Sequence, residues 1–427
     1  MKQQSVSTIL IEVAVAISCI PFSVEANGFR LPNQDAFAAG RGVAFVATAD
    51  NPSAVYYNPA GISQLEGQRL RVGMWALNME STYRSPENGS FENERRRHAI
   101  PQFFYTFSPK ELPLSFGLGV FAPFGLSMRW PDDTGFRTLA TQGSLEYLTI
   151  NPVVAWKIQP NLSIGAGLTF NRASLNLQQG VAWPDQAFDG FEFSGNGWDA
   201  GFNLGALWKP HEKVSLGVSF RSQTTIDLEG KTEYYNAIAV PPLPPSFPGI
   251  PSFPKNNVDA DARFPFPSML IVGISYRPTP DWNLEFNADY TNWDRVGTVK
   301  IKQARGFGTL IPQDVPVTLE WHSSWYYELG VTRYIGDAWS ISAGYVYNEN
   351  SVPDKYYSPL VADLNRNFLT IGAGYKGQSM SFDIAYQYGF APERTVSGSS
   401  PSSTGQTADG GYKYKSNALI ASLGWRF

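Results

Sequence analysis

The sequence predicts an all-β fold: a transmembrane antiparallel β-barrel of about 14 strands with an N-terminal hatch inside its lumen. Three observations predict it. Apolar and polar residues alternate along most of the 427-residue chain. The connections between the alternating segments are short and long in turn. After the N-terminus, no segment offers the ~18 consecutive apolar residues of a spanning helix, although only 16% of residues are charged and 14% are aromatic.

Residues 1–26 are predicted to be a secretory signal peptide. Lys2 supplies the positive charge, residues 13–22 the apolar core and Val24-Glu25-Ala26 the cleavage site. A competing interpretation makes Cys19 a lipidated N-terminus, but the residues before it match such a site weakly. Because Cys19 is the only cysteine, cleavage leaves a chain without disulfides, which suits a large, self-sufficient sheet.

Residues 27–67 are predicted to form the hatch. Within them, Asn51-Pro52 and Asn58-Pro59 favour turns, because the residue before a proline is pushed out of the helical region. Residues 36–49 have room for one short helix. An ordinary N-terminal loop is the alternative that this pattern leaves open.

Residues 68–427 are predicted to form the barrel, because alternation begins at Gln68. It is clearest in residues 162–171, 214–221, 282–290 and 380–389. Successive strand side chains point to opposite faces, so each segment has one apolar and one polar face. A soluble sandwich turns its apolar face inward, whereas a membrane barrel turns it outward towards lipid.

The connections separate these two folds. Tight turns such as Gln159-Pro160-Asn161 and Gly336-Asp337 alternate with long polar loops near residues 131–143, 179–197, 236–263, 303–316, 350–366 and 392–411. Tight turns at one rim and long loops at the other are typical of an outer-membrane barrel. The predicted strands start near Gln68, Arg97, Leu114, Ser144, Leu162, Trp198, Val214, Phe264, Trp282, Ser324, Ala338, Phe368, Met380 and Tyr414.

Two places interrupt the alternation. Pro123, Phe124 and Gly125 fall inside the third strand, where proline removes a ladder donor and glycine weakens the strand, so we expect a kink that opens the barrel wall. The alternative is a strand that simply ends at Phe121. The second interruption is a proline-rich, apolar loop, residues 241–254. It either presents apolar side chains to a hydrophobic ligand or serves as a bare spacer.

The chain resembles the FadL-type family, the outer-membrane long-chain fatty-acid transporters and their aromatic-hydrocarbon relatives. The resemblance covers essentially the whole mature chain. It rests on three motifs in this order and spacing: Asn58-Pro59-Ala60-Gly61, Tyr290-Thr291-Asn292-Trp293 and the terminal Gly424-Trp425-Arg426-Phe427.

The resemblance implies ligand capture between the outer loops and a second site in the lumen near the mature N-terminus. The residues expected to bind ligand are Asn27, Gly28 and Phe29, which match the family's small-Gly-Phe start, and Phe247 and Phe253 of the proline-rich loop. Asn58, Pro59 and Ala60 match the hatch motif and are expected to gate it. Pro123, Phe124 and Gly125 fall where ligand is expected to leave sideways into the bilayer.

The sequence departs from the family in one outer loop. Where the family often has Pro-Asp-x-Asp-Arg, this chain has Ala362-Asp363-Leu364-Asn365-Arg366. Asp363 and Arg366 are therefore the residues left for contact with a polar headgroup.

The sequence shows no pattern typical of a catalytic or metal site. His98, His211 and His322 lack ligand spacing, no G-x-S-x-G occurs, and the G-x-G-x-x-G at residues 372–377 precedes a strand rather than a helix. Glu285, Asp289 and Asp383 would share the lumen face with Arg221. A solvated, charge-compensated wall is favoured over a catalytic carboxylate set.

We therefore expect a non-enzymatic channel of the bacterial outer membrane for passive uptake of hydrophobic molecules, without cofactor or metal. The expected partners are a hydrophobic small-molecule ligand, outer-membrane lipid and lipopolysaccharide. A formal charge of only −4 argues against nucleic acid, and the protein is expected to be a monomer. An outer-membrane lipid-acting enzyme and a general porin or adhesin stay open as alternatives. The sequence does not separate fatty acids from aromatic hydrocarbons as substrates.

Overall fold

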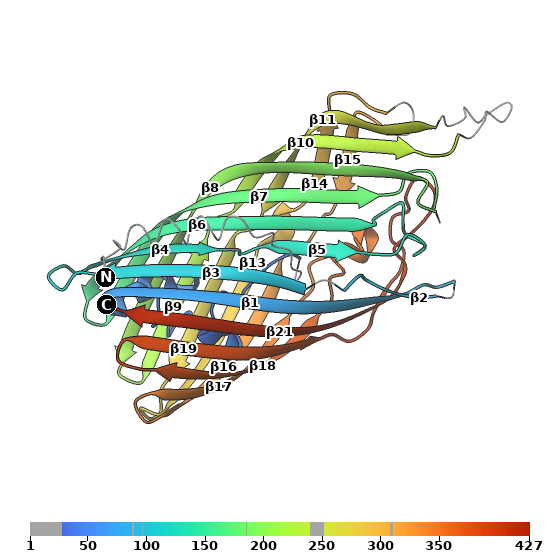
Figure 1. The fold of residues 1–427 in the computed structure, drawn as a ribbon. Coiled ribbons are helices and arrows are strands. Elements are labelled where there is room, and N and C mark those ends of the chain that lie inside the picture. Colours follow the sequence, from blue (N-terminus) through green and yellow to red (C-terminus); the bar gives the residue numbers. More distant parts are fainter. Residues whose placement is uncertain (1–27, 88, 96, 185, 240–251, 308–310) are drawn as a thin grey trace, which may run out of the picture.

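The computed structural model describes residues 28–87, 89–95, 97–184, 186–239, 252–307 and 311–427. Over these residues one antiparallel sheet closes on itself, because β1 (Gly67–Arg84) pairs with both β3 (Arg97–Ser108) and the last strand, β21 (Gly410–Arg426) (Figure 1). The closed barrel has 14 strands, which confirms the predicted fold. The predicted signal peptide, residues 1–26, and Asn27 lie outside the described residues.

Nine of the described barrel strands are continuous and five are built from two successive segments. Besides β1, β3 and β21, the continuous strands are β6 (Gln142–Gln159), β7 (Leu162–Gln179), β8 (Asp189–His211), β17 (Trp339–Asn348), β18 (Arg366–Lys376) and β19 (Met380–Phe390). The interrupted strands are β4 (Leu114–Phe121) with β5 (Gly125–Arg129), β9 (Val214–Arg221) with β10 (Thr224–Asn236), β11 (Phe253–Phe266) with β12 (Met269–Tyr276), β13 (Trp282–Thr291) with β14 (Thr298–Gln303), and β15 (Asp314–Thr318) with β16 (Ser324–Ile335). Short strands β2 (Ser90–Glu92) and β20 (Arg394–Val396) extend the sheet beside β1 and β21.

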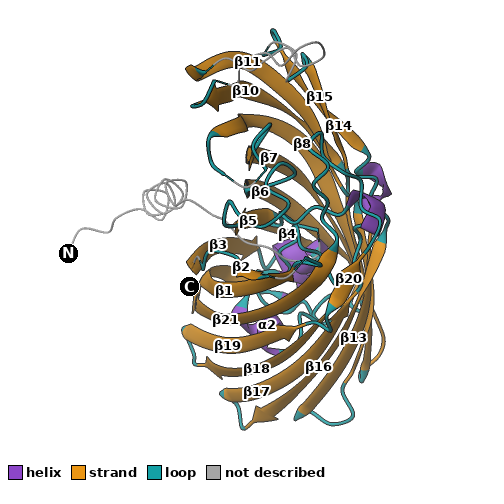
Figure 2. Cartoon of the chain, turned by 90° about the vertical axis from the view of Figure 1, so that its right-hand side faces the viewer, coloured by secondary structure: helices purple, strands orange, loops and turns teal. Residues whose placement is uncertain are grey.

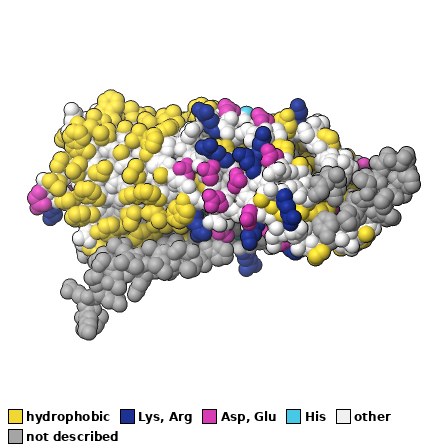
Figure 3. Space-filling model, turned by 90° about the horizontal axis from the view of Figure 1, so that it is seen from above, with side chains coloured by type: hydrophobic (Ala, Val, Ile, Leu, Met, Phe, Trp, Pro, Cys, Tyr) yellow, Lys and Arg dark blue, Asp and Glu magenta, His cyan; other side chains and the backbone are white. Residues whose placement is uncertain are grey.

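The apolar side chains of the lower barrel point outward. Leu168, Leu329 and Ile371 are 58%, 52% and 62% exposed, whereas the inward-facing Asn283 and Asn287 are buried. Figure 3 shows the result as an apolar surface over one half of the molecule and charged side chains beyond it. This sidedness is that of a membrane barrel and not of a soluble sandwich. No helix in the described part of the chain is both long and apolar enough to cross a membrane.

Above the strand interruptions the pattern of the barrel interior inverts. On β10 and β14 the buried side chains are Ile226, Leu228, Val299 and Ile301, while Asp227 faces outward. The upper barrel is thus apolar inside, as in a water-soluble protein, because its outer face meets water rather than lipid.

This inversion explains where the predicted strand starts were wrong. The strand expected to start near Trp198 begins at Asp189, and the last strand begins at Gly410 rather than Tyr414. The strand expected to start near Phe264 begins at Phe253. Each extension lies in the upper barrel, where the outward side chains are no longer apolar, and so it has the composition of a loop. Most other predicted starts agree with the structure to within two residues.

Residues 28–66 lie inside the barrel and are almost entirely buried. They contain the short helices α2 (Ala36–Gly40) and α3 (Ala54–Tyr57) and the 3-10 helix η1 (Pro59–Gln64), and Figure 2 shows the sheet curving around α2. The helix expected within residues 36–49 is therefore present but only five residues long. We call residues 28–66 the N-terminal segment. Two further 3-10 helices lie in connections, η2 (Trp293–Arg295) and η3 (Asp354–Tyr356).

Small residues let the N-terminal segment approach the wall closely. A Cβ atom added to Gly40 would lie 2.8 Å from the Cα atom of Gly372 on β18. Gly372 belongs to the G-x-G-x-x-G pattern at residues 372–377. A glycine pair at this contact permits backbone-to-backbone packing that any side chain would prevent.

Candidate functional site

Phe29 lies at the centre of a buried aromatic cluster. Its ring centroid is 4.9 Å from that of Trp293, 5.3 Å from Trp321 and 5.7 to 5.9 Å from three phenylalanines: Phe124, Phe264 and Phe266. Tyr147 packs on Phe124 and Phe266 from the other side. We call these seven side chains the aromatic cluster. They come from the N-terminal segment and from the interrupted levels of several strands, so the sequence did not bring them together.

Gly28 allows Phe29 to enter this cluster. Its φ is +59°, a left-handed conformation that glycine adopts without strain. A Cβ atom at this position would lie 2.6 Å from the ring of Trp293. The small-Gly-Phe start therefore has a steric reason in this fold.

The barrel wall has a gap beside the cluster. β4 ends at Phe121 and β5 begins at Gly125, and both pair with β6. Between these two residues the β4–β5 chain advances by four residues while β6 advances by only three, so the register shifts by one residue. β3 pairs with β4 through residues 103–107, but residues 97–102 of β3 pair only with β1 among the described strands. β5 likewise pairs only with β6 in the described residues. The upper part of β3 and β5 are thus adjacent in the strand order without a backbone ladder between them.

The N-terminal segment covers this gap from the inside. The Leu31 amide donates to the Pro123 carbonyl at 2.8 Å, and the Gly125 amide donates to the Phe29 carbonyl at 2.7 Å. Gln34 Nε2 donates to the Ala122 carbonyl at 2.7 Å. Backbone groups left without a strand partner by the interruption are therefore satisfied by residues 29–34.

The three carboxylates predicted to line the lumen, Glu285, Asp289 and Asp383, each pair with an arginine. Asp289 pairs with Arg30, whose Nη1 also donates to Thr291 Oγ1 at 3.0 Å. Glu285 pairs with Arg41 at 3.4 Å and accepts a hydrogen bond from the Ala47 amide at 2.8 Å. All of these charged side chains are buried.

A second ion-pair group lies lower in the barrel. Arg71 of β1 pairs with Asp383 of β19 at 2.8 Å and with Asp35, which caps α2 by accepting from the Phe37 and Ala38 amides. The prediction of a charge-compensated wall is thus right about compensation but wrong about solvent and partner. Arg221 pairs with none of the three carboxylates. Arg30 and Arg41 were not among the predicted site residues, although two arginines in a segment expected inside an acidic lumen were a usable signal.

The Asn-Pro-Ala motif joins the N-terminal segment to itself and to β8. Asn58 Nδ2 donates to the Val46 carbonyl at 2.8 Å and to the Ala206 carbonyl at 2.9 Å, and its Oδ1 accepts from the Ala60 amide at 3.1 Å. Pro59 starts the 3-10 helix that Asn58 caps. The motif therefore lies at a point of attachment to the wall.

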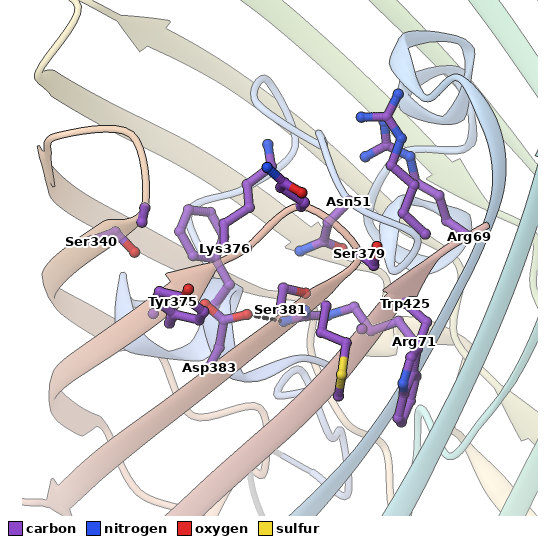
Figure 4. A pocket seen from close by; sticks show the side chains of 18 of the residues that line it. Asn51, Arg69, Arg71, Ser340, Tyr375, Lys376, Ser379, Ser381, Asp383 and Trp425 are labelled. Atoms are coloured by element: carbon purple, nitrogen blue, oxygen red, sulfur yellow. Dashed lines mark hydrogen bonds and ion pairs between the residues drawn. The ribbon is translucent and has the colours of Figure 1, made fainter.

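Two cavities lie along the inner side of the described barrel. A void of about 20 Å³, enough for roughly one water molecule, lies between the N-terminal segment and the wall and is lined by apolar side chains that include Val43, Trp75 and Tyr326. A larger pocket of about 290 Å³ lies at the tight-turn end, below Asn51 and beside the Arg71–Asp383 pair (Figure 4). A hydrophobic ligand that enters the smaller void must therefore displace the side chains that line it.

Asp363 and Arg366 are buried within an outer loop. Asp363 accepts hydrogen bonds from the Ser351 amide at 2.7 Å and the Ser351 hydroxyl at 3.1 Å. Arg366 donates to the Ala362 carbonyl at 3.0 Å and lies 4.3 Å from the centroid of the Tyr414 ring. Both side chains are thus engaged within the protein, where they hold the loop together.

Other expected site residues and sites are placed as follows. Phe247 lies outside the described residues, and Phe253 begins β11 without a described side chain. Among the described residues no group of three or more His, Cys, Asp or Glu side chains could hold a metal ion.

Comparison with known proteins agrees with this architecture. The family described as "Outer membrane protein transport protein (OMPP1/FadL/TodX)" matches residues 17–427. The "Long-chain fatty acid transport protein" of Salmonella typhi is 23% identical over 407 residues, which is 88% of this chain and 91% of that protein. The crystal structure of a Pseudomonas aeruginosa FadL homologue has a TM-score of 0.80 at 19% identity, covering 94% of this chain and 100% of that one. The Pseudomonas putida toluene transporter TodX has a TM-score of 0.73 at 17% identity, covering 94% and 100%.

Proposed function

Because the chain belongs to the OMPP1/FadL/TodX family of outer-membrane transport proteins, we propose that it carries hydrophobic molecules passively through the bacterial outer membrane and releases them sideways into the bilayer. As a member of this family it lies in the bacterial outer membrane, as predicted. One similar protein is named a fatty-acid transporter and another a toluene transporter, so both substrate classes fit the proposal.

The proposal rests on Phe29, because this one residue makes contacts in the lumen and at the gap. The Phe29 side chain lies in the aromatic cluster, while its carbonyl accepts the hydrogen bond from Gly125 at the wall. A ligand that takes the place of the Phe29 ring would pull this backbone away from the gap. Ligand binding and opening of the wall are thereby one event.

The route follows the change in the barrel interior. Ligand captured among the outer loops enters the upper barrel, which is apolar inside, and moves down to the aromatic cluster. The driving force is transfer of apolar surface out of water, about 25 cal/mol per Å². Below the cluster the inner wall is polar and the N-terminal segment fills the lumen. The gap at Pro123, Phe124 and Gly125 is therefore the exit with the lowest barrier for a hydrophobic ligand.

The N-terminal segment acts as the hatch in this proposal. Buried ion pairs at Arg30, Arg41 and Asp35 hold it at three places around the wall, and Asn58, Pro59 and Ala60 attach it to β8. Only residues 28–34 need to move for the gap to open, so the remainder continues to block leakage of water and ions. The gap, the N-terminal segment that covers it and the contacts that attach this segment to the wall all belong to one chain. We therefore propose that the protein acts as a monomer.

The test is uptake of labelled oleate and labelled toluene by cells that express the full chain. Pro123→Val and Gly125→Val together replace the kink with strand-forming residues, and Ala343→Val on β17 is the control for a bulkier side chain elsewhere in the wall. We expect the double variant to lose at least about tenfold in uptake, equivalent to about 1.4 kcal/mol in the barrier, and the control to match the wild type. Heat-modifiable migration in gels confirms that each barrel is folded.

Unchanged uptake in the double variant would remove the lateral exit. Large, steady ion conductance of the wild-type protein in planar bilayers would favour a general porin, because a filled lumen conducts poorly. Release of free fatty acid from phospholipid by the purified protein would favour a lipid-acting enzyme.

A further inference from the structure

Arg221 is a cation of the lumen that has no anionic partner among the residues the structure describes. It is the last residue of β9, on the same inward face as Gly217 and Ser219. Its guanidinium lies 5.1 Å from the ring centroid of Tyr56 and 5.2 Å from that of Phe121. Its Nη2 makes a long hydrogen bond of 3.4 Å to the Tyr56 carbonyl.

The arginines that are more deeply buried in the described structure all have an acidic partner. Each lies within 4.0 Å of at least one carboxylate oxygen: Arg30, Arg41, Arg71, Arg137 and Arg366. Within the described residues Arg221 has no such partner, and its Nη1 is enclosed without any hydrogen bond. A partly buried charge that lacks a counter-ion in the described structure is costly, so Arg221 is available to an anion from outside the chain.

The surroundings of Arg221 define what that anion is attached to. Phe121 is the last residue of β4 before the gap. On the other side, Tyr147 of the aromatic cluster is hydrogen-bonded to Thr224, which begins the strand segment after Arg221. The guanidinium is thus near both the gap and the cluster, with the Tyr56 and Phe121 rings beside it.

We propose that Arg221 binds the carboxylate of a hydrophobic ligand whose apolar chain lies in the aromatic cluster. Its planar fork of N–H donors matches a carboxylate, and the free Nη1 supplies a donor that the protein leaves unused. Arg30, which lies near the same Tyr56, is already neutralised by Asp289 and does not compete. This inference rests on the proposed transport function and adds its specificity: long-chain carboxylates are preferred over neutral hydrocarbons.

The test compares two ligands that differ only in the head. Oleate and oleyl alcohol are titrated against the full-length protein in lipid nanodiscs, and binding is followed by the fluorescence of the tryptophans, two of which lie in the cluster. The variants are Arg221→Met, which removes the charge, and Arg221→Lys, which keeps it without the fork. Arg172→Met, at an exposed position on β7, is the control for loss of one positive charge.

We expect Arg221→Met to weaken oleate binding by about ten- to a hundredfold, the range for hydrogen bonds to a charged group, and to change oleyl alcohol binding by less than about twofold. Arg221→Lys should lie between the wild type and the methionine variant for oleate only. Arg172→Met should match the wild type for both ligands.

Three results would overturn the inference: equal losses for both ligands, no loss for either, or wild-type affinity for oleyl alcohol as high as for oleate. In each of these the wild type still binds a hydrophobic molecule, so the transport function stands. Failure of the wild type to bind either ligand would instead refute the proposed function and the inference together.

Discussion

Replacing Arg30 with glutamine should detach the start of the N-terminal segment from the barrel wall. The Arg30 and Asp289 side chains are 2% and 0% exposed. Removing one member of such a pair leaves the other charge buried and uncompensated, at a cost of about 3–5 kcal/mol. At about 1.4 kcal/mol per factor of ten, the docking equilibrium shifts by roughly two to three and a half orders of magnitude.

The backbone hydrogen bonds at the gap are by themselves too weak to resist this shift. Two backbone hydrogen bonds, Leu31 to Pro123 and Gly125 to Phe29, hold the same residues against the gap. Each contributes about 0.5–1.5 kcal/mol net, which together is at most comparable to the loss. The barrel itself should stay folded, since the change acts on a segment that packs inside it.

Hydrogen–deuterium exchange in nanodiscs measures the effect. Arg30→Gln should speed exchange at the Leu31 and Gly125 amides by about a hundredfold or more, and Asp289→Asn should do the same. The double variant removes both charges and should return exchange towards the wild-type rate. Arg84→Gln is the control, because it breaks an exposed ion pair with Glu393 that is worth about 1 kcal/mol at most.

Two outcomes would refute this reasoning. One is slow, wild-type exchange at both amides in either single variant. The other is a double variant that exchanges as fast as the singles, because the loss would then come from packing and not from an uncompensated charge.

Three further predictions concern other contacts. Asn58→Asp should detach the middle of the N-terminal segment, because a carboxylate would face the two carbonyl oxygens that the amide now contacts at 2.8 and 2.9 Å; higher ion conductance in planar bilayers measures it, and wild-type conductance would contradict it. Gly40→Val should prevent packing of α2 because its Cβ would lie 2.8 Å from the Gly372 Cα, and protease cleavage within the segment should rise relative to wild type. In the outer loops, burial alone would raise the pKa of Asp409, but hydrogen bonds from Ser399 and a neighbouring amide outweigh it and lower the pKa below its ordinary 3.8. The contact therefore stabilises the loop above that pH and is lost as the pH falls through the lowered value, which the Ser399 amide resonance should report in the wild type but not in Asp409→Asn.

The lower barrel was predictable from sequence because lipid and water impose opposite demands on its two faces. Segments such as residues 162–171 show this directly: every outward position is apolar and every inward one small or polar. The upper barrel was less predictable, since water lies outside it and apolar packing inside it. The strand from Asp189 onward was therefore placed nine residues too late, near Trp198.

The candidate site was only partly predictable. Phe29 and the interruption at Pro123 were found because a motif and a proline mark them locally. The void, the role of Arg221 and the burial of Asp363 and Arg366 were not found, because each depends on what neighbouring strands bring to the same place. Whether a charged side chain is solvated or enclosed cannot be read from its own strand.

The amino-acid order alone determined that the chain forms a barrel, which face of each lower strand meets lipid, and that a non-strand segment precedes it. These follow from periodicity, which is a local property of the chain. Closure of the sheet decided the rest: Arg30 meets Asp289 across 259 positions, Phe29 meets Trp293, and no carboxylate of the described chain pairs with Arg221. Such contacts depend on strand register and on where the N-terminal segment packs in the lumen, and both are set only when the whole barrel closes around it.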